Sequence, residues 1–405
     1  MAPSRSPPQQ RTGLVLTGGG ARAAYQVGVL RAIAALLPAR SPSPFAVLCG
    51  TSAGAINAAC LAAGAADFRH AVRRLVGVWR NLRAGDVYRA DAPGIAACGA
   101  RWLAALMLGG LGRRNPASLL DNAPLAALLA RHVDFDGIAR AIDAGALDAV
   151  AVTASGYTSG ESISFFQAAG GADGWRRARR IGARADLSIA HLMASSAIPF
   201  VFPPVRIHRE YFGDGSMRQI APVSPALHLG ADRVLVVTVA ARQGAHSRTP
   251  ADGFPSLAQI AGHALDSIFL DALEADLERL ERINRTVAHM RAASVPSAPL
   301  GLRHVDAFVI APSEPLERIA ARHLHALPRP VRFFLRGIGA MRRSGSSLAS
   351  YVLFERPFCR ALLRLGYADA MARRAELERF LGLRATRAAT PRPAADAGAI
   401  TPLPA

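Results

Sequence analysis

Gly50-Thr51-Ser52-Ala53-Gly54 is the stretch that decides the fold of this 405-residue chain, because it places a serine between a strand and a helix. The apolar run 45–49 predicts a short buried strand, and the small residues 55–63 predict the helix. A G-x-S-x-G pentapeptide in that context is typical of a nucleophile elbow, where Gly50 and Gly54 allow a strained turn and close packing. The Ser52 hydroxyl is expected to project above the helix N-terminus, where negative charge is favoured. By itself, the pentapeptide also fits a glycine-rich turn with an incidental serine.

A second glycine-rich turn lies upstream, after another apolar run at 14–17. Gly18, Gly19 and Gly20 precede an amphipathic helix, and such a turn exposes backbone N–H groups that suit an anion. A dinucleotide-binding loop is the alternative. The sixth position of that motif is here Ala23, however, and no acidic residue ends the next predicted strand to hold a ribose. The pattern therefore favours an oxyanion-binding loop for a serine nucleophile.

The third motif is an aspartate between two glycines. Residues 205–212 alternate like one half-buried strand, and the chain continues as Gly213-Asp214-Gly215-Ser216. An ordinary Asp-Gly turn explains this pattern by itself. Because the elbow and the glycine loop are also present, Asp214 becomes the candidate for a second catalytic group at the strand end.

Taken in order, the glycine loop (GGGARAAYQVGVL), the elbow (GTSAG) and the later DGS resemble the patatin-like phospholipase family over roughly residues 12–240. The resemblance implies a three-layer α/β/α fold with a mostly parallel central sheet and appended C-terminal helices. It also implies a lipid acyl hydrolase in which Ser52 is the nucleophile, Asp214 completes a Ser–Asp dyad and the glycine loop forms the oxyanion hole. No metal or cofactor is expected.

The chain departs from the family pattern at two positions. Ala23 stands where the loop usually ends in glycine, and Ser216 follows Asp214-Gly215 where glycine or alanine is usual. Both replacements are small, so we expect the geometry to persist. Arg22 is expected to steady the loop or to contact a lipid phosphate, and a solvent-facing arginine is the plain alternative.

A Ser–Asp dyad implies a mechanism for ester hydrolysis. Ser52 must lose its proton as it attacks the carbonyl, and Asp214 would accept that proton and return it to the leaving alcohol or lysolipid. An aspartate is a weak base at its ordinary pKa of about 3.9. The site therefore works best if burial raises the pKa of Asp214 or if the oxyanion hole carries much of the catalysis.

Two other functions fit parts of the sequence. A Ser-Asp-His triad of the α/β-hydrolase type needs a histidine after Asp214, and the candidates are His228, His246, His263, His289 and His304. The elbow follows only two predicted strands, fewer than that fold normally has, and His228 and His263 fall in helix-like runs. A lipid-binding or scaffold module with an inactive site is the non-enzymatic alternative, which the two departures from the family pattern allow.

The chain is strongly basic, with a formal net charge of +19 and 48 basic residues, all arginine, against 29 acidic residues. No aromatic motif accompanies the arginines, so no nucleic-acid partner is expected; an anionic membrane surface is expected beside the lipid or ester substrate. The N-terminus has no apolar secretory core, which favours a cytoplasmic protein with peripheral membrane association. The cysteines have no metal-ligand spacing and are expected to be buried free thiols: Cys49, Cys60, Cys98 and Cys359.

The apolar stretch 93–112 is predicted to be a lid or interfacial helix over the acyl-binding cleft, with a core helix and a membrane span as alternatives. Its central Arg101 and its glycines argue against a span. Other predicted elements are a strand pair at 148–155 and 162–167, buried strands at 233–240 and 304–311, one long helix at 256–291 and two helices within 354–383. The expected parts of the chain are a disordered N-terminus (1–11), the catalytic core (12–240), a remaining strand with a helical extension (241–383) and a disordered tail (384–405).

Overall fold

A computed structural model describes residues 10–108, 118–241, 254–341 and 345–383. Its centre is a sheet in the order β10-β9-β1-β2-β3-β4-β6-β5, with β8 paired to β3 and β7 paired to β8. The run from β10 to β3 is parallel throughout, as expected. The strands are β1 (Thr12–Leu16), β2 (Val47–Thr51), β3 (Ala149–Gly156), β4 (Ser162–Ala168), β5 (Trp175–Arg177), β6 (Arg180–Arg184), β7 (Val205–Ile207), β8 (Glu210–Asp214), β9 (Arg233–Val237) and β10 (Asp306–Ile310).

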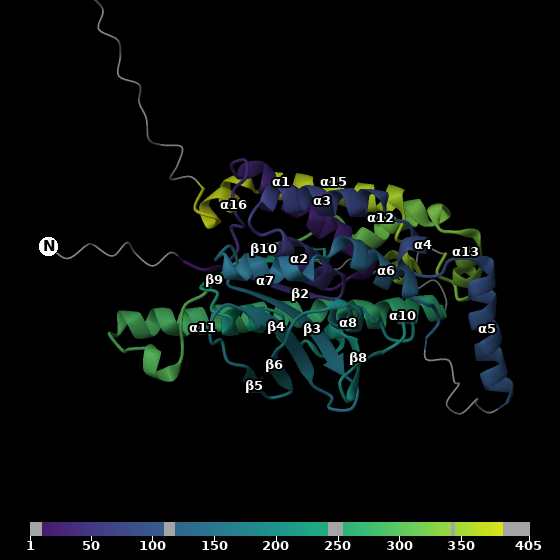
Figure 1. Ribbon diagram of the computed structural model, residues 1–405, viewed down its shortest axis with the longest axis horizontal. Coiled ribbons are helices and arrows are strands. Elements are labelled where there is room, and N and C mark those ends of the chain that lie inside the picture. Colours follow the sequence, from purple (N-terminus) through teal and green to yellow (C-terminus); the bar gives the residue numbers. More distant parts are fainter. Residues whose placement is uncertain (1–9, 109–117, 242–253, 342–344, 384–405) are drawn as a thin grey trace, which may run out of the picture.

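Helices cover both faces of this sheet (Figure 1). The helices are α1 (Ala24–Leu36), α2 (Ala53–Ala63), α3 (Phe68–Asn81), α4 (Ala84–Val87), α5 (Ala92–Met107), α6 (Ala123–His132), α7 (Phe135–Asp143), α8 (Ile189–Ser195), α9 (Ser224–His228), α10 (Leu257–Asp266), α11 (Ala272–Ala292), α12 (Leu316–His323), α13 (Arg329–Gly337), α14 (Ser346–Val352), α15 (Arg356–Ala372) and α16 (Arg374–Phe380). No helix in these described segments is both long and apolar enough to cross a bilayer.

Alternation along the central strands separates two apolar cores. On β1, Leu14 and Leu16 join the core that contains α1, α2, α3 and α15, whereas Val15 joins the core that contains α9 and α11. A strand presents successive side chains to opposite faces, so both faces of a central parallel strand must be apolar. The result is the three-layer α/β/α arrangement that the sequence predicted.

The C-terminal helices pack directly on the first helix of the chain. A Cβ on Gly28 of α1 would collide with the carbonyl of Leu363, and a Cβ on Gly366 of α15 would collide with that of Tyr25. These two glycines therefore let α1 and α15 approach closely, and the two helices lie side by side in Figure 1. Helix α15 therefore packs against α1, the helix that follows the glycine loop.

Most of the predicted elements are confirmed. The pair 148–155 and 162–167 forms the antiparallel β3 and β4, residues 233–240 and 304–311 contain the parallel β9 and β10, and 354–383 contains α15 and α16. The apolar stretch 93–112 is helical as α5 as far as Met107, and residues 109–112 lie outside the described ranges. The predicted disordered ends fall almost wholly outside these ranges as well.

Two predictions were wrong in detail. Residues 205–212 are not one strand but the hairpin of β7 and β8, which turns at His208 with φ 53°. Both strands of the hairpin keep the alternation of inward-facing and outward-facing residues, so the sequence pattern does not reveal the turn between them. Residues 256–291 are not one uniform helix, because the π-helical segment Ser267–Asp271 separates α10 from α11. An apolar repeat at helical spacing does not reveal such a local change of winding.

Candidate active site

Ser52 occupies the sharp turn between β2 and α2, with φ 55° and ψ −131°. A serine in this region is strained by about 1–3 kcal/mol, so the surrounding structure must hold it there. The Ser52 N–H donates to Ser195 Oγ at 2.8 Å, and that hydroxyl donates to the carbonyl of Thr153 at 2.6 Å. Ser195 therefore ties the elbow to β3.

The two elbow glycines are required by close backbone contacts. A Cβ on Gly54 would lie 2.6 Å from the carbonyl oxygen of Thr17, and one on Gly50 would lie 2.6 Å from the backbone of Ala55. Any side chain at either position would push α2 away from the carboxyl ends of β1 and β2. The G-x-S-x-G spacing therefore has a steric cause in this fold.

Asp214 reaches the elbow through the register of the sheet. Thr51 pairs with Thr153 on β3, and the next residue of β3, Ala154, pairs with Asp214 at the end of β8. The residue after Asp214 must be glycine, because a Cβ on Gly215 would collide with the carbonyl of Thr153. Because β4 pairs with the opposite side of β3, β8 lies on the same side of β3 as β2, just beyond the end of β2, and this places the two predicted catalytic residues close together.

The carboxyl group of Asp214 is fully buried and only partly satisfied. Its Oδ1 accepts a hydrogen bond from the Ser216 N–H at 3.0 Å, whereas Oδ2 has no hydrogen-bond partner of regular geometry among the described groups. Burial raises the pKa of Asp214 to about 6, against the opposing effects of the Ser52 hydroxyl and of Ser216. The side chain is therefore positioned beside Ser52 as a stronger base than an exposed aspartate.

The glycine loop lies next to this pair. The backbone N–H groups of Gly18 and Gly19 donate to no other group in the described part of the chain. A Cβ on Gly18 would collide with Ser216 Oγ, so the loop packs against the turn that follows Asp214. Gly20 has φ 54° and lines the same cavity as Ser52. The loop thus offers free N–H donors beside the serine, as an oxyanion hole requires.

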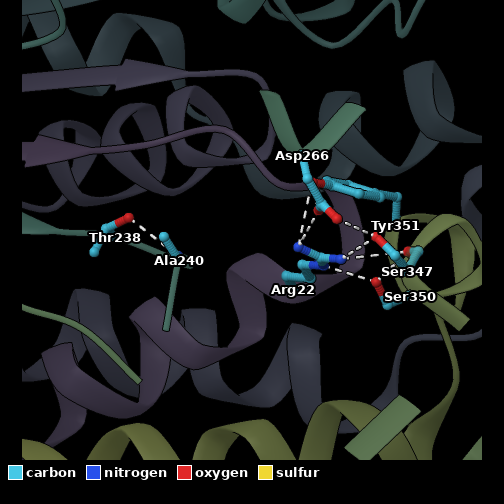
Figure 2. A network of polar contacts seen from close by, with 7 residues as sticks. All are labelled: Arg22, Thr238, Ala240, Asp266, Ser347, Ser350 and Tyr351. Carbon is cyan, nitrogen blue, oxygen red and sulfur yellow. Dashed lines mark hydrogen bonds and ion pairs between the residues drawn. The ribbon is translucent and has the colours of Figure 1, made fainter. Parts of the chain in front are cut away.

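Arg22 does not face solvent: its side chain is 2% exposed. It points into the polar network of Figure 2, where Nη1 pairs with Asp266 at 3.0 Å and the guanidinium stacks 4.0 Å from the ring of Tyr351. Its Nε donates to Ser350 Oγ at 2.7 Å and its Nη2 to Ser347 Oγ at 3.0 Å. Of its two expected roles, the buried position fits the steadying of the loop and leaves no access to a lipid phosphate.

An apolar cavity opens at Ser52. It lies between α2, α3, α6 and the segment 198–202. Most of its lining is aliphatic or aromatic, including Ile56, Leu75 and Phe202. Its charged or ionisable lining consists of Cys60, His70, Arg74 and His132, with no carboxylate. Such a cavity suits an acyl chain that enters next to the serine.

None of the five histidines proposed for a triad lines this cavity in the part that the structure describes. His228 stacks on Trp175 at 4.8 Å, and His304 lies 3.5 Å from Asp306. His263 and His289 lie on α10 and α11, and His246 falls outside the described ranges. The geometry therefore brings Ser52 together with Asp214 rather than with a histidine that follows it.

Among the described residues, no cysteine belongs to a cluster of His, Cys, Asp and Glu side chains that could hold a metal ion. Cys49 and Cys359 are buried free thiols and Cys60 is half-buried, whereas the side chain of Cys98 lies outside the description. Burial raises the pKa of Cys60 and of Cys359 to about 12, so both stay protonated near neutral pH.

Three supporting residues had no assigned role in the sequence analysis. Ser195 and Thr153 hold the elbow, and Asp266 holds Arg22. Each lies far along the chain from its partner, and no local spacing links them.

Comparison with known proteins identifies the family of this chain. A patatin-like phospholipase domain matches residues 14–227, which is more than half of the chain. Among solved structures, the crystal structure of VipD from Legionella pneumophila matches at 12% sequence identity and a TM-score of 0.29, over 86% of this chain and 67% of that one. No curated protein sequence matches. The chain therefore belongs to the patatin-like phospholipase family, and this membership implies a hydrolase that acts on lipid esters.

Proposed function

We propose that the protein is a lipid acyl hydrolase that forms an acyl-enzyme on Ser52, with Asp214 as the general base. The observation that carries this proposal is the Oδ2 of Asp214, which is fully buried beside a serine on a strained elbow and has no hydrogen-bond partner of regular geometry among the described groups. Buried polar atoms are nearly always hydrogen-bonded, and an exception needs an explanation. Here the explanation is that this carboxylate oxygen receives the proton of Ser52 during the reaction.

The reaction follows from the atoms around Ser52. Ser52 Oγ attacks the ester carbonyl carbon, and its proton passes to Asp214 Oδ2. The carbonyl oxygen becomes an oxyanion, which the free N–H groups of Gly18 and Gly19 stabilise. The tetrahedral intermediate then collapses, and Asp214 returns the proton to the leaving alcohol or lysolipid. Water attacks the acyl-enzyme in the same way and releases a fatty acid.

The raised pKa of Asp214 supports its role as the base. An aspartate of ordinary pKa is a poor acceptor for a serine proton, because the ideal catalytic pKa lies near the working pH. Burial brings the pKa of Asp214 to about 6, which leaves the group ionised near neutral pH but more basic than an exposed carboxylate. The carboxylate is therefore in its reactive form under the conditions in which esters are stable.

The lining of the cavity supports a lipid rather than a small polar ester. Its aliphatic and aromatic walls match a fatty acyl chain, and burial of apolar surface stabilises such a chain by about 25 cal/mol per Å². Phospholipids, lysophospholipids and neutral glycerides all carry this chain. The apolar walls therefore support a substrate that carries a fatty acyl chain. Hydrolysis of a panel of lipids with different head groups would identify the head group.

A fluorophosphonate probe tests the nucleophile directly. The wild-type protein should be labelled, Ser52→Ala should not, and Ser313→Ala, which removes an exposed serine on the loop before α12, should label like the wild type. Release of fatty acid from phosphatidylcholine, lysophosphatidylcholine, triglyceride and a soluble p-nitrophenyl ester should disappear together in Ser52→Ala. A well-folded wild type that takes no probe would instead identify a lipid-binding module with an inactive site.

A further inference from the structure

The apolar cavity beside Ser52 follows helix α2 along its whole length. Its lining begins at Ser52, the N-cap residue of α2, and reaches Gly64, the C-cap residue of the same helix. Ile56 and Cys60 line the cavity between these two ends. The four residues recur at every fourth position, which places neighbours of the series close together along one side of a helix. At a rise of 1.5 Å per residue, the row from Ser52 to Gly64 is about 18 Å long.

Helix α3 lines the same cavity and runs in the opposite direction. Trp79 of α3 lies beside the first half of α2, because its indole N–H donates to Asn57 Oδ1 at 2.8 Å. Ala71 of α3 lies at the other end, where a Cβ on Gly64 would be 2.7 Å from the Cβ of Ala71. The start of α3 therefore marks the end of the cavity that is far from the serine.

Polar side chains gather at this far end. His70, Arg74 and His132 line the cavity there and are exposed, and we call these three residues the polar rim. The rim is held together between α3 and α6, since Arg74 Nη2 donates to the carbonyl of His132 at 3.4 Å. Between the rim and the serine, the lining of α2, α3 and α6 is aliphatic or aromatic apart from the protonated thiol of Cys60, which behaves as a small apolar group.

The distance from the serine to the polar rim matches the acyl chain of a membrane lipid. The hydrocarbon core of a bilayer is about 30 Å thick and consists of two layers of chains, so one chain spans about 15 Å. The row of about 18 Å along α2 covers such a chain from its ester carbonyl to its methyl end. A short acyl group would leave most of the apolar wall uncovered, and a longer chain would extend past the polar rim.

We infer that the protein selects its acyl substrates by length along α2. Ile56 and Cys60 are the residues that determine chain length, and Gly64 with the polar rim marks the position of the methyl end. The preferred substrates are therefore lipids with full-length membrane acyl chains. The inference rests on the proposed function, because it takes the ester carbonyl at Ser52 as the start of the chain. It adds the chain length, which the apolar character of the walls does not specify.

A series of p-nitrophenyl esters tests this inference, with butanoyl, octanoyl, dodecanoyl, palmitoyl and icosanoyl chains in one neutral detergent. For the wild type, kcat/KM should rise with chain length, by up to about fourfold for each buried methylene, because each methylene adds apolar contact. The rise should end near the palmitoyl ester, with no further gain for the icosanoyl ester, whose end passes the polar rim.

Two substitutions should shorten the preferred chain by different amounts. Cys60→Phe places a ring about 12 Å along α2 from the serine, and Ile56→Phe places one at about 6 Å. The rise in kcat/KM should therefore end beyond the octanoyl ester in Cys60→Phe and beyond the butanoyl ester in Ile56→Phe. In both variants the ratio of kcat/KM for the palmitoyl ester to that for the butanoyl ester should fall about tenfold or more.

Ala127→Phe is the matched control for the added ring. Ala127 is exposed on α6, which contributes Leu125 and Leu128 to the wall, but Ala127 does not itself line the cavity. This variant should keep the chain-length profile of the wild type. Thermal melting shows which variants fold. Cys60→Met, whose side chain is flexible, replaces Cys60→Phe if the ring prevents folding, and it should shift the profile in the same direction.

Calorimetric titration of the Ser52→Ala protein with octanol and dodecanol measures chain length without turnover. Dodecanol should bind more tightly than octanol, and adding Cys60→Phe should remove that advantage. Equal length profiles with and without Cys60→Phe, in kinetics or in binding, would overturn the inference and leave the fluorophosphonate reaction of Ser52 untouched. A wild type that shows the Cys60-dependent binding but hydrolyses no ester would instead contradict the proposed function alone.

Discussion

Two carboxylates beside the glycine loop illustrate opposite uses of an aspartate. Asp214 is fully buried, yet its Oδ2 has no hydrogen-bond partner of regular geometry among the described groups. Asp266 is 31% exposed, yet it is bound by Arg22 at 3.0 Å, by the Tyr351 hydroxyl at 2.8 Å and by Ser347 Oγ at 2.6 Å. The more buried group thus has the fewer partners.

The difference separates reactivity from positioning. A fully satisfied carboxylate is held in its charged form and contributes to a rigid network, whereas an unsatisfied buried one is destabilised and ready to accept a proton. The network of Asp266 fixes Arg22, which belongs to the turn that follows Gly18 and Gly19. We therefore interpret Asp214 as a reacting group and Asp266 as a positioning residue, and the following experiments test that contrast.

The largest effect is expected for Asp214→Asn. Loss of the base should lower kcat for a soluble ester by about 10²–10⁴-fold, while Asn retains an oxygen that accepts from the Ser216 N–H. Steady-state kinetics together with thermal melting checks this expectation. Full activity in a folded Asp214→Asn protein would exclude Asp214 as the base.

The second expectation concerns pH, where activity and stability should change in opposite directions. The folded pKa of Asp214, about 6, lies above its ordinary value of 3.8, so ionisation of this buried group destabilises the folded state. The difference corresponds to a cost of about 3 kcal/mol above pH 6, which disappears as the pH falls towards 3.8. Catalysis needs the ionised form and should decrease below pH 6.

A comparison of wild type with Asp214→Asn measures both parts. The variant should be the more stable protein at pH 7–8, and this advantage should vanish below about pH 4, as urea unfolding at several pH values would show. The kcat/KM of the wild type should fall about tenfold for each pH unit below 6. A stability difference that does not depend on pH would contradict the buried, ionising carboxylate.

A smaller effect is expected for Asp266→Asn. The guanidinium of Arg22 would lose its ionic partner, which should cost about 2 kcal/mol of stability. Displacement of the glycine loop should lower kcat by roughly tenfold to a hundredfold with little change in KM. Urea unfolding and kinetics on the soluble ester measure the two effects.

Asp369→Asn provides the control for that variant. Asp369 also accepts from a tyrosine, the Tyr25 hydroxyl at 3.0 Å, and from the Ser313 N–H at 3.0 Å, but in the described part of the chain it makes no hydrogen bond to Gly18, Gly19, Gly20 or Arg22. Its replacement should reduce stability by a similar amount and leave kcat unchanged. If both variants lower kcat equally, the effect is a general loss of stability and Asp266 does not position the loop.

The sequence predicted the turns at Ser52 and Asp214 better than the elements around them. Gly50, Gly54 and Gly215 each avoid a collision with backbone atoms. These glycines are close neighbours of Ser52 and Asp214 in the sequence, so the sequence itself indicates the tight turns there. The hairpin at His208 and the π-helical segment after α10 were missed, because an apolar period continues through both. Arg22 was left with several expected roles, since nothing near it in the sequence specifies a partner.

By itself, the sequence determined that a glycine loop, a serine and an aspartate each lie at the end of a strand in an α/β fold. These features depend on local backbone geometry, which the glycines and the ends of the apolar strand patterns indicate directly in the sequence. Only the tertiary structure decided that Asp214 is buried beside Ser52 with a raised pKa, and that Arg22 binds Asp266, 244 residues away. Burial and hydrogen-bond partners depend on segments that meet only when the chain is folded, and no short stretch of sequence contains both partners.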